Sequence, residues 1–165
     1  MKFMTRMAMV LLGVFALAGP AGAGGPPSTA EVLGKIHSAN VREYRMGKMA
    51  REYGRAREVR TFGQTLIQDH DAADEKVVQL AKEEGITLAA HTPEVGPLKM
   101  PMGAAFDAAF SRDMLVTHRK DVAAVKAARD ATQDEKLRSL LTDILPVLQK
   151  HEETAQQLVD LGSKS

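Results

Sequence analysis

The chain has 165 residues, no cysteine and no tryptophan, and aromatic residues make up only 4% of it. Lysines and arginines number 22 against 21 aspartates and glutamates, so the clustered basic excess of a nucleic-acid binder is absent. Without cysteine, disulfides, thiolate metal sites and cysteine catalysis are excluded. The length suits one domain with its own hydrophobic core.

Residues 1–23 have the pattern of a secretory signal peptide. Lys2 and Arg6 give a positive start, an apolar run covers 7–18, and small residues follow at 21–23, as signal peptidase requires. The apolar run is shorter than the roughly 20 residues of a membrane span. We therefore expect cleavage after Ala23, a location in the periplasm or cell envelope, and no integral membrane span in the mature chain. Retention of the segment as a membrane anchor is the alternative.

The remainder predicts a single all-α domain over residues 29–162, preceded by a short leader at 24–28. Ser28 to Glu31 is a capping box, in which the serine hydroxyl and the glutamate carboxylate bind free N–H groups of a helix start. Apolar residues then recur at steps of three and four as far as Tyr53. A second helix is expected over about 56–84, with Gly85 at its C-terminal cap.

Residues 86–102 contain several prolines and cannot form a regular helix. They predict a long connector, which could run the length of the bundle or fold as a local loop. A third helix is expected from about Gly103, and a fourth after Thr132 to Glu135, which again has the capping-box pattern. Pro146 predicts a kink in the fourth helix. Four such helices predict a four-helix bundle without strands.

One polar residue interrupts the apolar seam of each predicted helix: Glu43, His70, His118 and His151. Burying a polar group costs free energy unless it has a partner, so we expect these side chains to share one layer of the core. The offset of His151 along its helix makes its place in the layer the least constrained of the four.

Two interpretations of this layer remain open. In the first, the imidazoles and the carboxylate bind one iron, copper or zinc ion, and nearby carboxylates orient the ligands. The candidate orienting residues are Asp69, Asp71, Asp74 and Asp121. In the second, the same side chains form a hydrogen-bonded layer that fixes the register of the helices.

Other metal sites and catalytic sets are less well supported. A ferritin-type di-iron centre needs Glu-x-x-His on two helices, but the residues three before the three histidines are Ile67, Leu115 and Leu148. His37 and His91 are predicted to be solvated. Met100 and Met102, near His91, suggest copper(I), which accepts thioether ligands. No nucleophile–base set or phosphate-binding loop is visible, so no catalytic residue is assigned.

The chain resembles a bacterial family called domain of unknown function 4142, whose members are often labelled as candidate outer membrane proteins. The resemblance covers about 30–155. Its segments are Asn40 to Ala50 (NVREYRMGKMA), Phe62 to Asp71 (FGQTLIQDHD), Phe106-Asp107 through His118 to Asp121, and Leu145 to Leu148 followed by His151. It implies an exported, ferritin-like helical bundle, with the family's Asp-His pair at Asp69 and His70. It implies no activity.

These observations predict a non-enzymatic periplasmic bundle, with a stress-related role as one hypothesis, whose His/Glu layer binds one transition metal. The alternative is an interaction or chaperone-like module, with a protein partner or a second copy of the chain, in which the layer is purely structural. An exposed apolar groove would favour that alternative. A redox enzyme with an open metal position is a third, weaker hypothesis.

Overall fold

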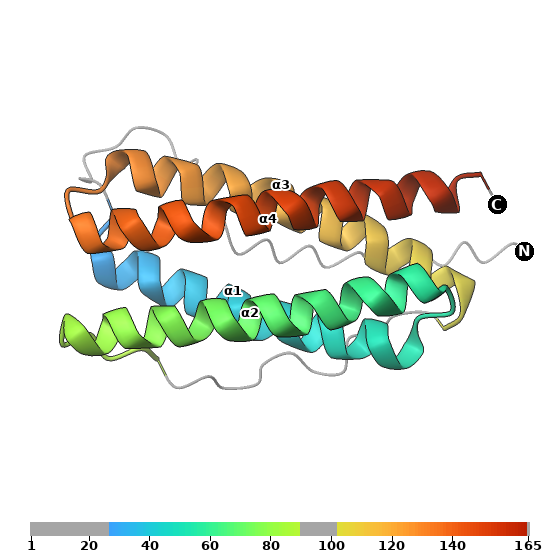
Figure 1. Cartoon of the computed structure of the whole chain (residues 1–165), viewed down its shortest axis with the longest axis horizontal. Coiled ribbons are helices and arrows are strands. Elements are labelled where there is room, and N and C mark those ends of the chain that lie inside the picture. The colour runs from blue at the N-terminus through green and yellow to red at the C-terminus, as the bar shows by residue number, and fades with distance from the viewer. Residues whose placement is uncertain (1–26, 90–101, 165) are drawn as a thin grey trace, which may run out of the picture.

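A computed structural model of the chain describes residues 27–89 and 102–164. Within these ranges it contains four helices and no strand: α1 (Thr29–Tyr53), α2 (Arg57–Glu83), α3 (Ala104–Ala131) and α4 (Glu135–Gly162). The helices lie side by side along one axis (Figure 1). The predicted all-α four-helix bundle is confirmed. The signal peptide and most of the leader lie outside the described residues and stay predictions.

Three of the predicted helix ends are confirmed. Ser28 caps α1 in a complete capping box with Glu31, and Gly54 is its C-cap. Gly85 follows α2 with a φ of 66°, the left-handed conformation that glycine adopts without strain. Ser28 satisfies backbone N–H groups that the first turn of a helix leaves free, and the glycines let the chain leave the helical conformation at its end.

The predicted start of α4 was wrong by two residues. Its N-cap is Asp134, whose carboxylate accepts hydrogen bonds from the backbone N–H groups of Lys136 and Leu137. Thr132 caps nothing in α4; its hydroxyl accepts a hydrogen bond from the backbone N–H of Asp134 and so shapes the turn. Aspartate and threonine both cap helices well, so the sequence offered two competing starts. The helix then runs through Pro146 without interruption, and the predicted kink stays untested.

The helices form two antiparallel hairpins, α1 with α2 and α3 with α4, and the hairpins meet mainly through α2 and α4. The start of α3 lies beside the α1–α2 turn, where Asp107 accepts hydrogen bonds from the backbone N–H groups of Arg55 and Ala56. The start of α4 lies beside the end of α2, where Lys136 pairs with Glu84 at 3.0 Å. The end of α2 and the start of α3 therefore lie at opposite ends of the bundle (Figure 1), as in bundles with one long crossover connection such as the ferritin-like folds.

The core has two apolar halves with a polar layer between them. One half includes Leu33, Val77 and Leu141, and the other includes Phe62, Phe110 and Met114. None of the described helices is long and apolar enough to cross a membrane. The two halves hold all four helices together on both sides of the polar layer, and so fix the positions of the polar side chains.

Candidate metal centre

The polar layer consists of the four residues that interrupt the apolar seams. Glu43 of α1 and His118 of α3 are 0% exposed, His151 of α4 is 1% exposed and His70 of α2 is 3% exposed. The centroids of the three imidazole rings lie 5.1 to 5.8 Å apart. The structure thus brings together one side chain from each helix.

Two of the imidazoles have one ring nitrogen against a fixed hydrogen-bond acceptor. We call this nitrogen the outer nitrogen of the ring and the other one the inner nitrogen. His118 Nδ1 lies 2.9 Å from the backbone carbonyl oxygen of Met114. His151 Nε2 lies 2.8 Å from Oδ2 of Asp69. A carbonyl or carboxylate oxygen only accepts, so the proton of each neutral ring sits on the outer nitrogen and the inner nitrogen keeps its lone pair.

His70 is held through a chain of polar side chains on α1 and α2. Its Nδ1 lies 3.1 Å from Oδ1 of Asn40, and the Asn40 amide group lies 3.4 Å from Oδ1 of Asp74. The same oxygen of Asp74 lies 2.8 Å from Nδ1 of His37. Asp74 therefore supports His70 at one remove, through Asn40.

The inner atoms of the layer are buried and have no hydrogen bond. They are both carboxylate oxygens of Glu43, Nε2 of His70, Nε2 of His118 and Nδ1 of His151. Oε2 of Glu43 lies 2.8 Å from Nε2 of His70 and 3.0 Å from Nε2 of His118, the distances of ion pairs. The carboxylate of Glu43 and the two Nε2 atoms thus offset one another by charge, whereas Nδ1 of His151 is buried without a hydrogen bond, which is costly.

The charges of Glu43 and His118 are coupled. Burial disfavours the ionised form of Glu43, but the charge of His70 and the close approach of His118 and His70 outweigh it and hold the pKa of Glu43 well below its usual range. Burial likewise opposes the charge on His118, but Glu43 raises the pKa of His118 above its ordinary value. In the absence of a metal, these directions favour a carboxylate paired with an imidazolium.

His151 and Asp121 are shifted toward their neutral forms. Burial and the neighbouring His70 lower the pKa of His151 to about 4. Burial and the negative charge of Glu43 raise the pKa of Asp121, which is 7% exposed, to about 8. A neutral imidazole at His151 has the protonation state that a metal ligand needs.

The three histidines can each offer one ligand atom, and these atoms lie within 4.8 Å of one another. A metal bonded to nitrogen at about 2.0–2.1 Å holds two ligand nitrogens roughly 3–4 Å apart, so a small inward shift of the rings is enough. The outer hydrogen bonds of the rings match the pattern by which proteins orient histidine ligands. The donor set fits one transition-metal ion.

Of the four carboxylates expected to support the site, Asp69 contacts a candidate ligand directly, Asp121 is buried beside Glu43 and Asp74 acts through Asn40. Asp71 is exposed. The predicted solvation of His37 was wrong, because the side chain is only 16% exposed and contacts Asp74.

Asn40 was missed in the sequence, although it lies three residues before Glu43 and therefore on the same face of α1. His91 and Met100 lie outside the described residues, so the copper(I) suggestion stays a prediction. Met102 is 68% exposed.

The chain belongs to the family named domain of unknown function 4142, whose model matches residues 16–158. No curated protein and no solved structure matches the chain. The family has no assigned function, so any functional conclusion must come from the site.

Proposed function

We propose that this protein is an exported metal-binding bundle in which Glu43, His70, His118 and His151 hold one transition-metal ion. The observation that carries the proposal is the division of each imidazole into an outer nitrogen with a hydrogen-bond partner and an inner, buried nitrogen without one. A metal ion would satisfy the three inner nitrogens and the Glu43 carboxylate together.

The ligand chemistry defines a class of ion. Three imidazoles and one carboxylate suit iron, copper or zinc, whereas magnesium and calcium prefer oxygen ligands. The chain has no cysteine, so a thiolate does not compete. In the metal-free protein Glu43 is favoured as a carboxylate and His118 as an imidazolium. Metal binding should therefore release a proton from His118, and the metal affinity should weaken as the pH falls.

The test is the metal content of the full chain, expressed in a bacterium and purified without a polyhistidine tag. A His118→Gln variant removes an imidazole but keeps a polar side chain, and Lys126→Gln, at an exposed position of the same helix, is the control outside the cluster. We expect one iron, copper or zinc ion per chain in the parent and in the control, and none in His118→Gln.

The competing interpretation is a purely structural polar layer, supported by the charge pairing of Glu43 with His118. It predicts no metal in any of the three proteins, even after incubation with Fe²⁺, Cu²⁺ and Zn²⁺, and lower stability of His118→Gln. That result would redirect the search toward a protein partner or a second copy of the chain.

We also propose that the protein acts in the periplasm or cell envelope. The support is the signal-peptide pattern at residues 1–23, with its positive start, apolar run and small residues at the cleavage site. The mass of the purified protein tests this, because cleavage after Ala23 leaves Gly24 as the first residue. An uncleaved chain in the membrane fraction would support an anchored form instead.

A further inference from the structure

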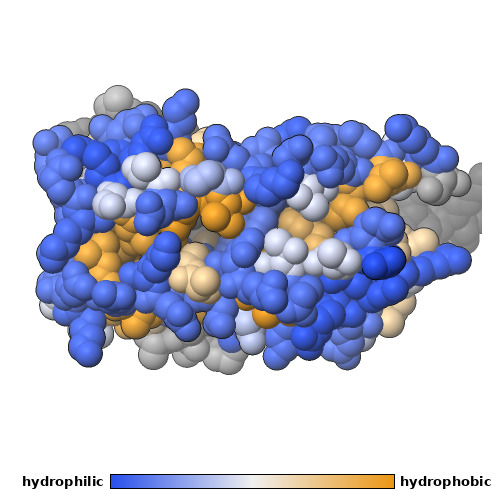
Figure 2. Space-filling view, in the orientation of Figure 1, coloured by the Kyte–Doolittle hydropathy of each residue, from blue (hydrophilic) through white to orange (hydrophobic). Residues whose placement is uncertain are grey.

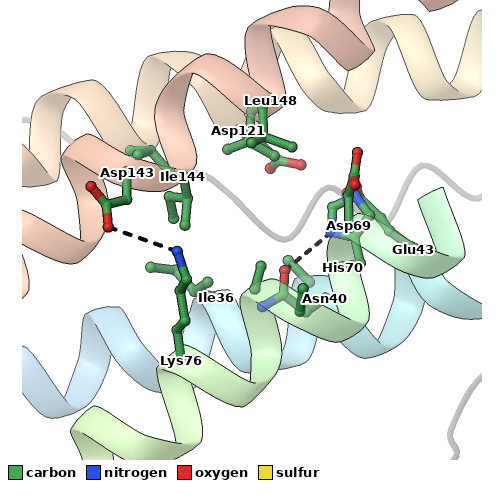
Figure 3. Close-up of a pocket in the computed structure, with 15 residues that line it drawn as sticks. Ile36, Asn40, Glu43, Asp69, His70, Lys76, Asp121, Asp143, Ile144 and Leu148 are labelled. Carbon is green, nitrogen blue, oxygen red and sulfur yellow. Dashed lines mark hydrogen bonds and ion pairs between the residues drawn. The ribbon is translucent and has the colours of Figure 1, made fainter. Parts of the chain in front are cut away.

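A pocket of about 140 Å³ lies between the two helix hairpins. Figure 2 shows apolar surface at the bottom of a hollow between α2 and α4, and Figure 3 shows the pocket residues of α1 and α2 facing those of α3 and α4. At its rim Lys76 of α2 pairs with Asp143 of α4 at 3.7 Å, and both side chains are more than half exposed. The pocket is therefore open to solvent.

The inner end of this pocket is the polar layer. Glu43 and His70 line it, whereas His118 and His151 do not. An ion held by the four side chains would thus be covered by protein on the side of His118 and His151 and approached by the pocket on the side of Glu43 and His70. Asn40 and Asp121 also line this end.

The lining determines what can reach this end of the pocket. Its walls are mainly aliphatic and include Ile36, Ala39, Ala73, Ile144 and Leu148. Its carboxylates, at Glu43, Asp69 and Asp143, outnumber the single ammonium group of Lys76, and Asp121 is shifted toward its neutral form. Aliphatic walls disfavour hydrated ions, and the carboxyl groups repel anions.

We infer that the pocket is the path by which a small uncharged molecule, of the size of nitric oxide or dioxygen, reaches an open coordination position of the metal. This inference rests on the proposed metal site and names the class of ligand that the site accepts. The small side chains of Ala39 on α1 and Ala73 on α2 keep the path open from two sides.

The experiment uses the full chain loaded with Fe²⁺ without oxygen, with the bound iron measured before any ligand is added. Nitric oxide is the probe, because its complex with ferrous iron has a characteristic high-spin EPR signal. Ala73→Leu and Ala39→Leu are two independent blocking variants. Ala127→Leu, at an exposed position of α3 outside the pocket, is the matched control.

We expect all four proteins to bind iron, and the nitrosyl signal to form in the parent and in Ala127→Leu. The signal should be lost, or form far more slowly, in whichever blocking variants keep the parent's circular dichroism spectrum. Stoichiometric iron without a nitrosyl signal in the parent would overturn the open position, and an undiminished signal in a folded blocking variant would overturn the path. Failure to bind iron, by contrast, would overturn an iron site itself.

Discussion

The three imidazoles differ in the strength of the group that holds the outer nitrogen. His70 has a neutral amide at Asn40, His118 a backbone carbonyl at Met114, and His151 a carboxylate at Asp69. A charged acceptor makes a shorter and stronger hydrogen bond than a neutral one and raises the basicity of a metal-bound imidazole. The orientation of His151 therefore depends most on its outer partner.

Asp69→Asn tests this dependence. The amide is close in shape to the carboxylate but removes its charge, so the hydrogen bond to His151 weakens while the fold is kept. We expect about 10–100-fold weaker metal binding, measured by competition with a chelator of known affinity. The control is Asp71→Asn on the same helix, where the side chain is exposed. Equal losses in the two variants would show that overall charge, and not orientation, is responsible.

Asp121 gives the metal-free protein a dependence on pH. Its pKa is about 8 in the fold against an ordinary 3.8, so between these values the folded chain binds more protons than the unfolded chain. Stability must then fall as the pH rises toward 8, by about 1.4 kcal/mol per pH unit at most. We expect the parent to lose about 2 kcal/mol between pH 6 and 8 relative to Asp121→Asn, in urea unfolding with a chelator present. If the stabilities of the parent and of Asp121→Asn changed in parallel with pH, Asp121 would not be the source of the pH dependence.

The sequence predicted Glu43 and the three histidines because each stands where the helical period demands an apolar residue. It could not predict which carboxylate each of them meets, since a contact such as that of Asp69 with His151 joins residues far apart in the chain. His37 shows the same limit. Its place near a helix start indicated exposure, whereas the packing of α1 against α2 half buries it beside Asp74.

The position of Glu43 relative to His70 depends on how closely α1 and α2 approach each other. A Cβ atom added to Gly47 would lie 2.6 Å from the carbonyl oxygen of Gly63, and one added to Gly63 would lie 2.7 Å from that of Gly47. Such distances leave no room for a side chain. The two helices touch backbone to backbone here, one turn from Glu43.

Gly47→Ala should therefore destabilise the protein by about 1–3 kcal/mol, because the helices must separate to accommodate the methyl group. Gly34→Ala on the same helix is the control. Apart from its chain neighbours and the backbone of its own helix, no atom lies within 4 Å of the added group there, and alanine in a helix interior is favoured over glycine by about 0.5–1 kcal/mol. Urea unfolding should give shifts of opposite sign, and a neutral or stabilising Gly47→Ala would refute the close packing.

The start of α4 depends on the charge of Asp134. Hydrogen bonds from the backbone N–H of Leu137 and from Thr29 lower its pKa below the ordinary 3.8. The contribution of the ionised side chain is thus complete above that value and is lost as the pH falls through the lower folded pKa.

Asp134→Ala should cost about 1 kcal/mol at neutral pH, and this difference from the parent should shrink in acid. Asp134→Asn should keep most of the stability at neutral pH, because asparagine caps helices about as well. Thermal unfolding from neutral to acid pH checks both statements. A deficit of Asp134→Ala that does not change with pH would assign the effect to packing and not to the charge of the cap.

Helix ends were predictable where one residue type alone satisfies the terminus, as at Ser28 and Gly85. The start of α4 was not, because Thr132 and Asp134 compete and local sequence does not rank them. The start of α2 could not be found from capping rules at all. Ala56 offers no side-chain cap, and Asp107 of α3 binds its backbone N–H instead.

At the scale of the whole molecule, the sequence predicted four helices but left the direction of the third open. Contacts between the ends of the helices decide the direction of α3. Asp107 at the start of α3 binds the α1–α2 turn, and Asp134 at the start of α4 accepts a hydrogen bond from the Thr29 hydroxyl at the start of α1. Helices α2 and α3 therefore run in the same direction. Each hairpin supplies two members of the polar layer.

Metal binding should consequently stabilise the interface between the hairpins. Glu43 and His70 belong to one hairpin and His118 and His151 to the other, so an ion bound by all four is lost when the hairpins separate. At a free metal concentration 100 times the dissociation constant, the gain is about 2.7 kcal/mol. For a chain of this size that corresponds to a rise in Tm of roughly 5–10 °C.

Thermal unfolding with added metal, and again after excess chelator, measures this gain. Lys126→Gln should show the full rise, because it leaves the cluster and its hydrogen-bond partners intact. His118→Gln should show none, because its hairpin contributes one ligand fewer and the remaining three side chains bind too weakly to matter at that concentration. An equal rise in both variants would mean that the ion binds elsewhere on the chain. No rise in the parent at saturating metal would mean that the polar layer joins the hairpins through its own charges, with Glu43 as the carboxylate and His118 as its imidazolium partner.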